Sequence, residues 1–137
     1  MNARSMLVAG LSLVLAACQG PGAAGGREGA ASLEQALERL QVTLGEEVEN
    51  VPNFRLNGWA RIDTTHLMVT AGLHDHYLLT LLQPCFGLDY AFRIAIESRS
   101  FMLTRFDDVM VSGIHDGPER CRIESIHRLD DKPGTEN

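Results

Sequence analysis

His74 and His76 flank Asp75 in the motif of this sequence that is best suited to bind a metal. Side chains at positions i and i+2 of an extended chain point to the same side. Two neutral imidazoles in that arrangement could bind copper or zinc, but a tight site needs a third or fourth ligand. The sequence places no other histidine close to them, and the remaining ones are His66, His115 and His127. The motif therefore indicates a copper or zinc site or, more simply, an exposed polar loop.

Asp107 and Asp108 form an acidic pair that could act as general acid and base. A turn is the simpler interpretation, because Asp side chains accept hydrogen bonds from nearby backbone N–H groups. Ser112 lies in no G-x-S-x-G pattern, so the sequence holds no nucleophile elbow. Since no complete catalytic set is present, we expect a protein that is not an enzyme and that needs no cofactor.

The N-terminus has the features of an export signal. A short start carrying Arg4 precedes a largely apolar run over residues 6–17. Twelve residues of helix reach about 18 Å, which is too short to cross a bilayer core of about 30 Å. A short charged start followed by a short apolar run is typical of a secretory signal peptide. The run ends in Leu15-Ala16-Ala17-Cys18, which resembles the lipobox of bacterial lipoproteins.

This resemblance implies that residues 1–17 are removed and that Cys18 is acylated on its sulfur and on its new amino terminus. Two or more acyl chains anchor a protein stably to a membrane. Gln19 follows the cysteine where an Asp would imply retention, so the resemblance implies the periplasmic face of the outer membrane. The alternatives are a buried N-terminal helix and ordinary secretion without lipid.

After the anchor, residues 18–32 are rich in glycine and alanine and hold no large apolar side chain. They predict a flexible linker of about 20 Å root-mean-square length. Residues 33–137 then form a single globular domain with a polar C-terminal tail. The chain has 137 residues and a net charge of −6, with 12 Lys and Arg against 18 Asp and Glu, which argues against nucleic-acid binding.

Within the domain, leucines at helical spacing predict an amphipathic helix over residues 33–44, capped by Ser32 and Gln35 and stopped by Gly45. The acidic residues that follow are expected in a solvated loop. From Pro52 onward, six or seven short strands recur at roughly ten-residue spacing. The fold class is therefore mainly β or α+β, a small antiparallel sheet or barrel with one N-terminal helix.

Trp59 falls on the polar register of the strand predicted over residues 54–62. Its indole could form a binding surface. The predicted helix also needs an apolar surface to rest on, so we expect the helix to cover Trp59.

Cys85 and Cys121 remain once Cys18 is assigned to lipid. An exported domain folds in an oxidising compartment, so we predict a disulfide between them. Two free buried thiols are the alternative. A redox-active pair is a third possibility, although the sequence has no C-x-x-C spacing.

Residues 54–129 are similar to a family of small Gram-negative lipoproteins known as a domain of unknown function. The similarity rests on the motifs Trp59, Tyr77-Leu78-Leu79, Cys85, Phe106-Asp107-x-Val109 and Cys121-x-Ile123-x-x-Ile126. It implies that Cys85 and Cys121 are paired and that Asp107 is structural, and it brings no activity with it.

Together these features predict a lipid-anchored protein of the cell envelope that serves as a structural or interaction module. Its partners would be the membrane, through the anchor at Cys18, and an envelope protein. The alternative is a periplasmic copper- or zinc-binding protein that uses His74 and His76. A small enzyme is a third possibility.

Overall fold

The structure is a computed structural model that describes residues 24–113 and 117–134. The predicted signal peptide, the predicted lipidation site Cys18 and His115 lie outside these residues.

The one α-helix within the described residues, α1, spans Ala24–Leu40 and differs from its prediction at both ends. Residues 24–32, which the sequence assigns to a flexible linker, are helical. No proline interrupts this segment, and each residue added to an existing helix gains a backbone hydrogen bond. The helix ends at Leu40 because Gln41 takes the left-handed conformation of a helix C-cap, with φ of 58°. Among the residues that the structure describes, no helix is long and apolar enough to span a bilayer.

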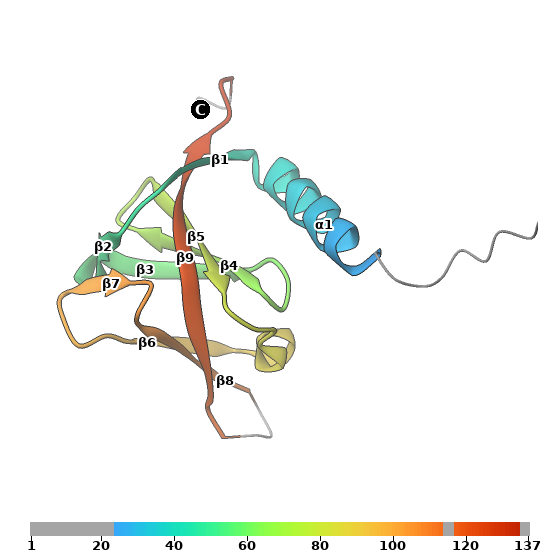
Figure 1. Cartoon of the computed structure of the whole chain (residues 1–137). Coiled ribbons are helices and arrows are strands. Elements are labelled where there is room, and N and C mark those ends of the chain that lie inside the picture. Colours follow the sequence, from blue (N-terminus) through green and yellow to red (C-terminus); the bar gives the residue numbers. More distant parts are fainter. Residues whose placement is uncertain (1–23, 114–116, 135–137) are drawn as a thin grey trace, which may run out of the picture.

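Nine strands and two 3-10 turns follow α1. They are β1 (Val42–Glu47), β2 (Asn50–Pro52), η1 (Asn53–Arg55), β3 (Leu56–Arg61), β4 (His66–Ala71), β5 (Asp75–Leu81), η2 (Phe86–Tyr90), β6 (Arg93–Glu97), β7 (Met102–Thr104), β8 (Asp108–Ser112) and β9 (Glu119–Asp131). The main sheet is antiparallel with the order β3-β4-β5-β9-β8-β6, and it curls into a half-barrel (Figure 1). The prediction of a mainly β domain with one N-terminal helix is confirmed.

The thirteen-residue strand β9 runs through the middle of this sheet (Figure 1). One of its edges pairs with β5, and the other pairs first with β8 and then with β1. The predicted last strand ended at Ile126, with a polar tail from Asp130. The strand continues to Asp131 because β1, which the sequence assigned to a helix end and an acidic loop, pairs with it.

Gly45 belongs to β1 and does not stop a helix. A Cβ atom there would lie 2.9 Å from the backbone oxygen of Arg128 and 2.6 Å from an Asp130 carboxylate oxygen. The register of β1 against β9 shifts between Leu44 and Glu47. Glycine at Gly45 therefore permits the close approach of two strands at an irregularity.

The concave face of the half-barrel holds the main core. Its fully buried members come from most strands and include Val51, Leu67, Leu79, Leu103, Val109 and Ile126. Val51 and Leu103 are register partners in the separate β2–β7 ribbon. The ribbon therefore contributes to this core although it is not part of the main sheet.

A second, smaller apolar cluster lies on the convex face under α1. It consists of Leu37, Val42, Leu78 and Leu129, with Leu33, Ile62 and Met68 packed against it. Lys132 at the end of β9 donates its backbone N–H to the Gln41 oxygen and forms an ion pair with Glu38. These contacts fasten the C-terminal part of α1 to the sheet.

Trp59 faces the concave core, and the prediction that α1 covers it is wrong. A bulge shifts the register of β3 against β4 between Leu56 and Gly58. Leu56 pairs with Ala71 before the bulge and Trp59 pairs with Val69 after it, so both side chains point to the core. A one-residue shift exchanges the two faces of a strand, which the alternation in the sequence does not reveal.

Cys85 and Cys121 form the predicted disulfide, with a Cα–Cα distance of 5.9 Å. Both residues are buried in the main core. The bond joins the segment between β5 and η2 to the first half of β9, across 36 residues of sequence.

We expect thiol reagents to label neither cysteine in the folded, non-reduced chain carrying Cys18→Ser. Replacing both Cys85 and Cys121 by serine should lower the free energy of unfolding by about 4 kcal/mol, because the closed loop restricts the unfolded chain. Urea denaturation followed by Trp59 fluorescence measures this loss, with Cys18→Ser alone as the control. Quantitative labelling of both thiols without reduction would contradict the assignment.

Candidate functional site

The motif proposed for metal binding lies at the hairpin between β4 and β5. His74 is exposed in the turn, whereas His76 lies within β5 and its Nδ1 is 3.0 Å from Thr70 Oγ1. Asp75 accepts a hydrogen bond from Arg128 at 3.3 Å. One histidine is therefore free in a turn and the other is engaged with a neighbouring strand, and a copper or zinc site there stays a prediction.

His66 is held by a turn far from that motif. Its Nδ1 lies 2.9 Å from Asp63 Oδ2, and Asp63 Oδ1 accepts hydrogen bonds from the backbone N–H groups of Thr65 and His66. Burial alone would raise the pKa of the Asp63 carboxyl, but the hydrogen bonds from Thr65 and His66 together lower it. The arrangement stabilises the predicted turn at residues 63–65.

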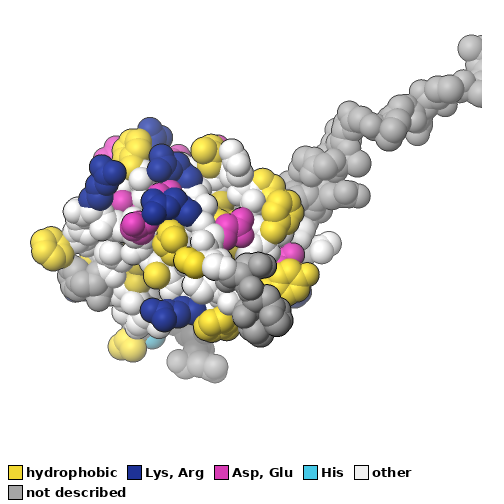
Figure 2. Space-filling model, turned by 90° about the horizontal axis from the view of Figure 1, so that it is seen from below, with side chains coloured by type: hydrophobic (Ala, Val, Ile, Leu, Met, Phe, Trp, Pro, Cys, Tyr) yellow, Lys and Arg dark blue, Asp and Glu magenta, His cyan; other side chains and the backbone are white. Residues whose placement is uncertain are grey.

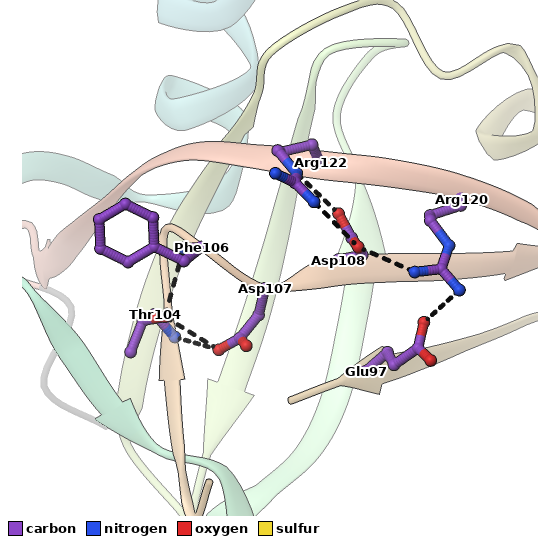
Figure 3. Close-up of polar contacts among 7 residues, drawn as sticks. All are labelled: Glu97, Thr104, Phe106, Asp107, Asp108, Arg120 and Arg122. Atoms are coloured by element: carbon purple, nitrogen blue, oxygen red, sulfur yellow. Dashed lines mark hydrogen bonds and ion pairs between the residues drawn. The ribbon is translucent and has the colours of Figure 1, made fainter. Parts of the chain in front are cut away.

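Asp107 stabilises the turn between β7 and β8 (Figure 3). Its buried carboxylate accepts hydrogen bonds from the backbone N–H of Thr104 at 2.7 Å and from the Thr104 hydroxyl at 3.1 Å. Its backbone oxygen accepts a hydrogen bond from Ile123 in β9. The interpretation of this residue as part of a turn is confirmed.

Asp108 makes a different set of contacts from Asp107 (Figure 3). Its buried carboxylate lies 3.1 Å from Arg122 Nε and 3.2 Å from an Arg120 nitrogen, and Arg120 also pairs with Glu97 at 2.8 Å. The Arg122 hydrogen bond lowers the pKa of Asp108 although burial opposes this, and Asp108 in turn raises the pKa of Arg122. The network joins β6, β8 and β9.

Asp107 and Asp108 therefore do not share a common acid–base site. Each carboxylate is occupied by its own donors, which belong to a turn in one case and to an ion-pair network in the other. This geometry supports a structural role for both residues.

Cys85, Cys121 and Glu119 form the one cluster of three metal-ligating residues within residues 24–113 and 117–134. Their ligand atoms all lie within 4.8 Å of one another. In the structure the two sulfur atoms are bonded to each other, so the cluster is a disulfide with the Glu119 carboxylate beside it.

The main candidate for a binding site is a groove of about 340 Å³ between β3 and β6, called here the seam groove. Its lining residues are Asn53, Leu56, Asn57, Gly58, Trp59, Val69, Ile94, Ala95 and Ile96. β3 and β6 are the two ends of the main sheet, and no described strand pairs with their outer edges. The half-barrel therefore stays open along this line, with Trp59 on one wall and Ile94 and Ile96 on the other.

The lining of the seam groove contains no acidic, basic, thiol or imidazole group. Its polar groups are the side chains of Asn53 and Asn57, the indole N–H of Trp59 and the backbone of two strand edges. The Asn57 amide already donates to the oxygen of Gly72 at 2.7 Å. Such a surface can bind through apolar contact and backbone hydrogen bonds, but it offers no group for proton transfer or nucleophilic attack.

Exposed aromatic side chains also occur outside the seam groove, and one of them, Phe106, lines a second hollow of about 660 Å³ beside Glu47, Glu49 and Arg105. Phe86, Tyr90, Phe92, Phe101 and Phe106 are all more than half exposed. Figure 2 views the end of the half-barrel near β8, where hydrophobic side chains occur as separate groups among arginine and acidic side chains. Isolated apolar side chains are normal on a protein surface, whereas a binding site needs a continuous patch.

The sequence did not reveal the seam groove, because the groove depends on which strands end the sheet. One local signal was available in the pair Asn57-Gly58, since glycine inside a predicted strand suggests a bulge. That signal would have placed Trp59 on the core side.

Comparison with known proteins identifies a family for this chain. A family model described as a family of unknown function (DUF6491) matches residues 1–134. It extends beyond the predicted similarity over residues 54–129 to include α1 and the N-terminal segment. No curated protein and no solved structure matches the chain.

Asp108→Asn should lower the free energy of unfolding by about 1–2 kcal/mol at pH 7, since the variant loses the charge that binds two half-exposed arginines. Because the pKa of Asp108 is lower in the folded state, its stabilisation is present above about pH 4 and is lost as the pH falls further. Urea denaturation between pH 3 and 7 measures this difference.

Asp131→Asn is the matched control, because Asp131 is exposed at the end of β9 and makes no side-chain bond among the described residues. The two variants should differ at pH 7 and converge near pH 3. An equal loss for Asp108→Asn at both pH values would show that its charge is not responsible.

Proposed function

The chain belongs to a family of unknown function (DUF6491), and we propose that it is a lipid-anchored interaction module of the cell envelope that binds an extended segment of a partner protein in the seam groove. The observation that carries this proposal is an apolar groove flanked by the outer edges of β3 and β6, with which no described strand pairs.

Anchoring through Cys18 is supported by the apolar run over residues 6–17 and the lipobox-like ending. The five residues 19–23 separate Cys18 from α1, and even fully extended they reach only about 18 Å. A lipid at Cys18 would therefore hold the start of the helix near the membrane. Gln19 supports placement on the periplasmic face of the outer membrane.

Binding of an extended segment is supported by the chemistry of the strand edges. An edge strand presents unpaired N–H and C=O groups, which pair readily with an added strand. A segment lying between β3 and β6 could pair with either edge while its alternate side chains contact Trp59, Ile94 and Ile96. Because the lining carries no charge, we expect apolar side chains on the inward face of that segment.

A role without catalysis is supported by the same lining. General acid–base and nucleophilic mechanisms need titratable or nucleophilic side chains at the bound substrate, and none of the seam groove residues provides one. The volume of about 340 Å³ is at the small end of the range for ligand sites, which suits a few side chains better than a large cofactor.

The groove is tested with a photo-crosslinking amino acid at Ala95, which is exposed and lines the groove, in intact cells. We expect an adduct with one defined peptide segment of a partner. Addition of that peptide to the purified chain should slow hydrogen exchange in both β3 and β6. Trp59→Ala should weaken its binding by about 30-fold, as is typical of a central aromatic contact.

Two controls make this result specific. The same crosslinker at Glu124, an exposed residue of β9, should give no such adduct, and Phe86→Ala, which removes an exposed aromatic side chain outside the groove, should bind normally. Adducts only with lipid or with a second copy of the chain would exclude a partner segment as the occupant. Equal binding by Trp59→Ala and the unaltered chain would also contradict the proposal.

Cys18→Ser should release the protein from the membrane fraction, as a soluble periplasmic form or an uncleaved precursor, because the sulfur that carries lipid is lost. Cell fractionation with immunoblotting measures the change, and Ser12→Ala in the same apolar run is the control. Unchanged membrane association with normal processing of Cys18→Ser would show that the chain is not a lipoprotein.

A further inference from the structure

The cluster of Cys85, Cys121 and Glu119 shares no residue with the lining of the seam groove and takes no part in the proposed function. We propose that reduction of the disulfide converts this cluster into a zinc site, in which the two thiolates and the Glu119 carboxylate bind one Zn²⁺. Oxygen and sulfur ligands of these kinds are those that zinc takes in proteins.

The three ligand atoms already lie within 4.8 Å of one another. The two cysteines are held by different elements, Cys121 by β9 and Cys85 by the segment before η2, with Cα atoms 5.9 Å apart. Cys85 is 1% exposed and Cys121 is 6% exposed. The surrounding strands and core therefore hold the two backbone segments close together, and after reduction the sulfur atoms would have to separate to about 3.8 Å to bind one Zn²⁺ at tetrahedral angles.

Glu119 lies on the core-facing register of β9, which is unusual for a carboxylate. It is the register partner of the buried Val111, and it is two residues before Cys121, so both side chains leave the strand on the same side. Among the described residues no cation pairs with Glu119. The neighbouring Arg120 and Arg122 turn to Asp108 on the other face (Figure 3).

Gly87 in η2 holds the carboxylate in place. Its backbone N–H donates to Glu119 Oε2 at 2.6 Å. A Cβ atom at Gly87 would lie 2.5 Å from that oxygen and 3.5 Å from a Val111 methyl group, so a larger residue would displace the Glu119 carboxylate from its present position. One backbone amide satisfies one carboxylate oxygen, and the remaining lone pairs are free to bind a cation.

Reduction of the disulfide and binding of Zn²⁺ conserve electrons and protons. A dithiol supplies two electrons and two protons, the Cys85–Cys121 bond breaks to give two thiols, and the dithiol becomes a cyclic disulfide. Zn²⁺ then displaces both thiol protons, which pass to solvent. Glu119 provides the third ligand. A hollow of about 210 Å³ opens to solvent beside the cluster, so a water molecule can complete a tetrahedral site. Its lining includes Gln83, Glu119 and Cys121 and also Arg120 and Arg122, whose charges are paired with Asp108.

The bound cation would take over the mechanical role of the disulfide. In both states a bridge through Cys85 and Cys121 joins the η2 segment to β9. The oxidised chain uses a covalent bond and the reduced chain would use a metal, so loss of the disulfide need not loosen this end of the half-barrel.

The test uses the full chain carrying Cys18→Ser, purified in detergent, which leaves only the two cysteines of the cluster. After anaerobic reduction and removal of the reductant, Co²⁺ should bind with one equivalent and give thiolate-to-cobalt absorption, and Zn²⁺ should displace it. The oxidised chain should give no thiolate-to-cobalt absorption. Zn²⁺ should also raise the Tm of the reduced chain but not that of the oxidised chain.

Glu119→Gln keeps an oxygen that can accept from Gly87 but removes the charge, and we expect it to weaken Zn²⁺ binding tenfold or more. Glu124→Gln, on the exposed face of the same strand, should bind as the unaltered chain does. Failure of the reduced chain to bind one equivalent would overturn the proposal. Equal Zn²⁺ affinity of Glu119→Gln and Glu124→Gln would also overturn it, since a reduced, unfolded chain with two free thiols would give that result.

Discussion

The pairing of β9 on both of its edges is the interaction on which the rest of the domain depends. Its thirteen residues hold β5 along one edge and β8 and β1 along the other, so neither half of the half-barrel can form without it. Connecting segments also bond to its backbone: Val48 donates to the Ile126 oxygen, and Ile123 donates to the Asp107 oxygen.

Because β9 is the last of the described strands, its contacts with β1 and β5 join residues far apart in sequence. Such contacts carry a large loop-closure entropy until several form together. The disulfide at Cys121 and the Asp108 network both fall on the first half of β9, where the chain returns from β8.

The elements that could be predicted from the sequence are those that local pattern decides. Alternation predicted β4 and the end of β3, apolar residues on both faces predicted β5 as an inner strand, and Asp63 and Asp107 predicted turns that their side chains do stabilise. The disulfide followed from the count of cysteines left after Cys18. The same local reasoning failed where a tertiary contact decides the structure. The leucine stripe continued to Leu44, but Val42 and Leu44 pair with β9, and strand pairing there replaces the last turn of the predicted helix.

The bulge in β3 shows most clearly why the candidate site could not be derived from sequence. Read as a regular strand, residues 54–62 place Trp59 with the arginines on the polar face. One irregular step at Asn57 places Leu56 and Trp59 on the same side of the sheet. As a result Trp59, which was expected to lie under α1, lines the seam groove. The opposite wall, Ile94 and Ile96, comes from a strand that is distant in sequence and becomes a neighbour only because the sheet curls and ends there. The alternation of residues along one segment does not show where a bulge exchanges the two faces of the strand. It also does not show which strands lie at the ends of the sheet.

The two proposed sites are neighbours across a single strand. Val109 in β8 is the register partner of Ile96 on one side and of Cys121 on the other. Ile96 lines the seam groove, Cys121 belongs to the disulfide, and Val109 itself is fully buried. Protein cores transmit displacements because they are closely packed, so the state of the cysteine pair can affect the groove only through this row of side chains and the backbone of β8. A bridge at Cys121, whether covalent or through a metal, joins β9 to the segment before η2, and β9 pairs with β8, which pairs in turn with the groove strand β6. The open edge of the sheet and the disulfide are therefore connected through two consecutive strand pairings, β6 with β8 and β8 with β9.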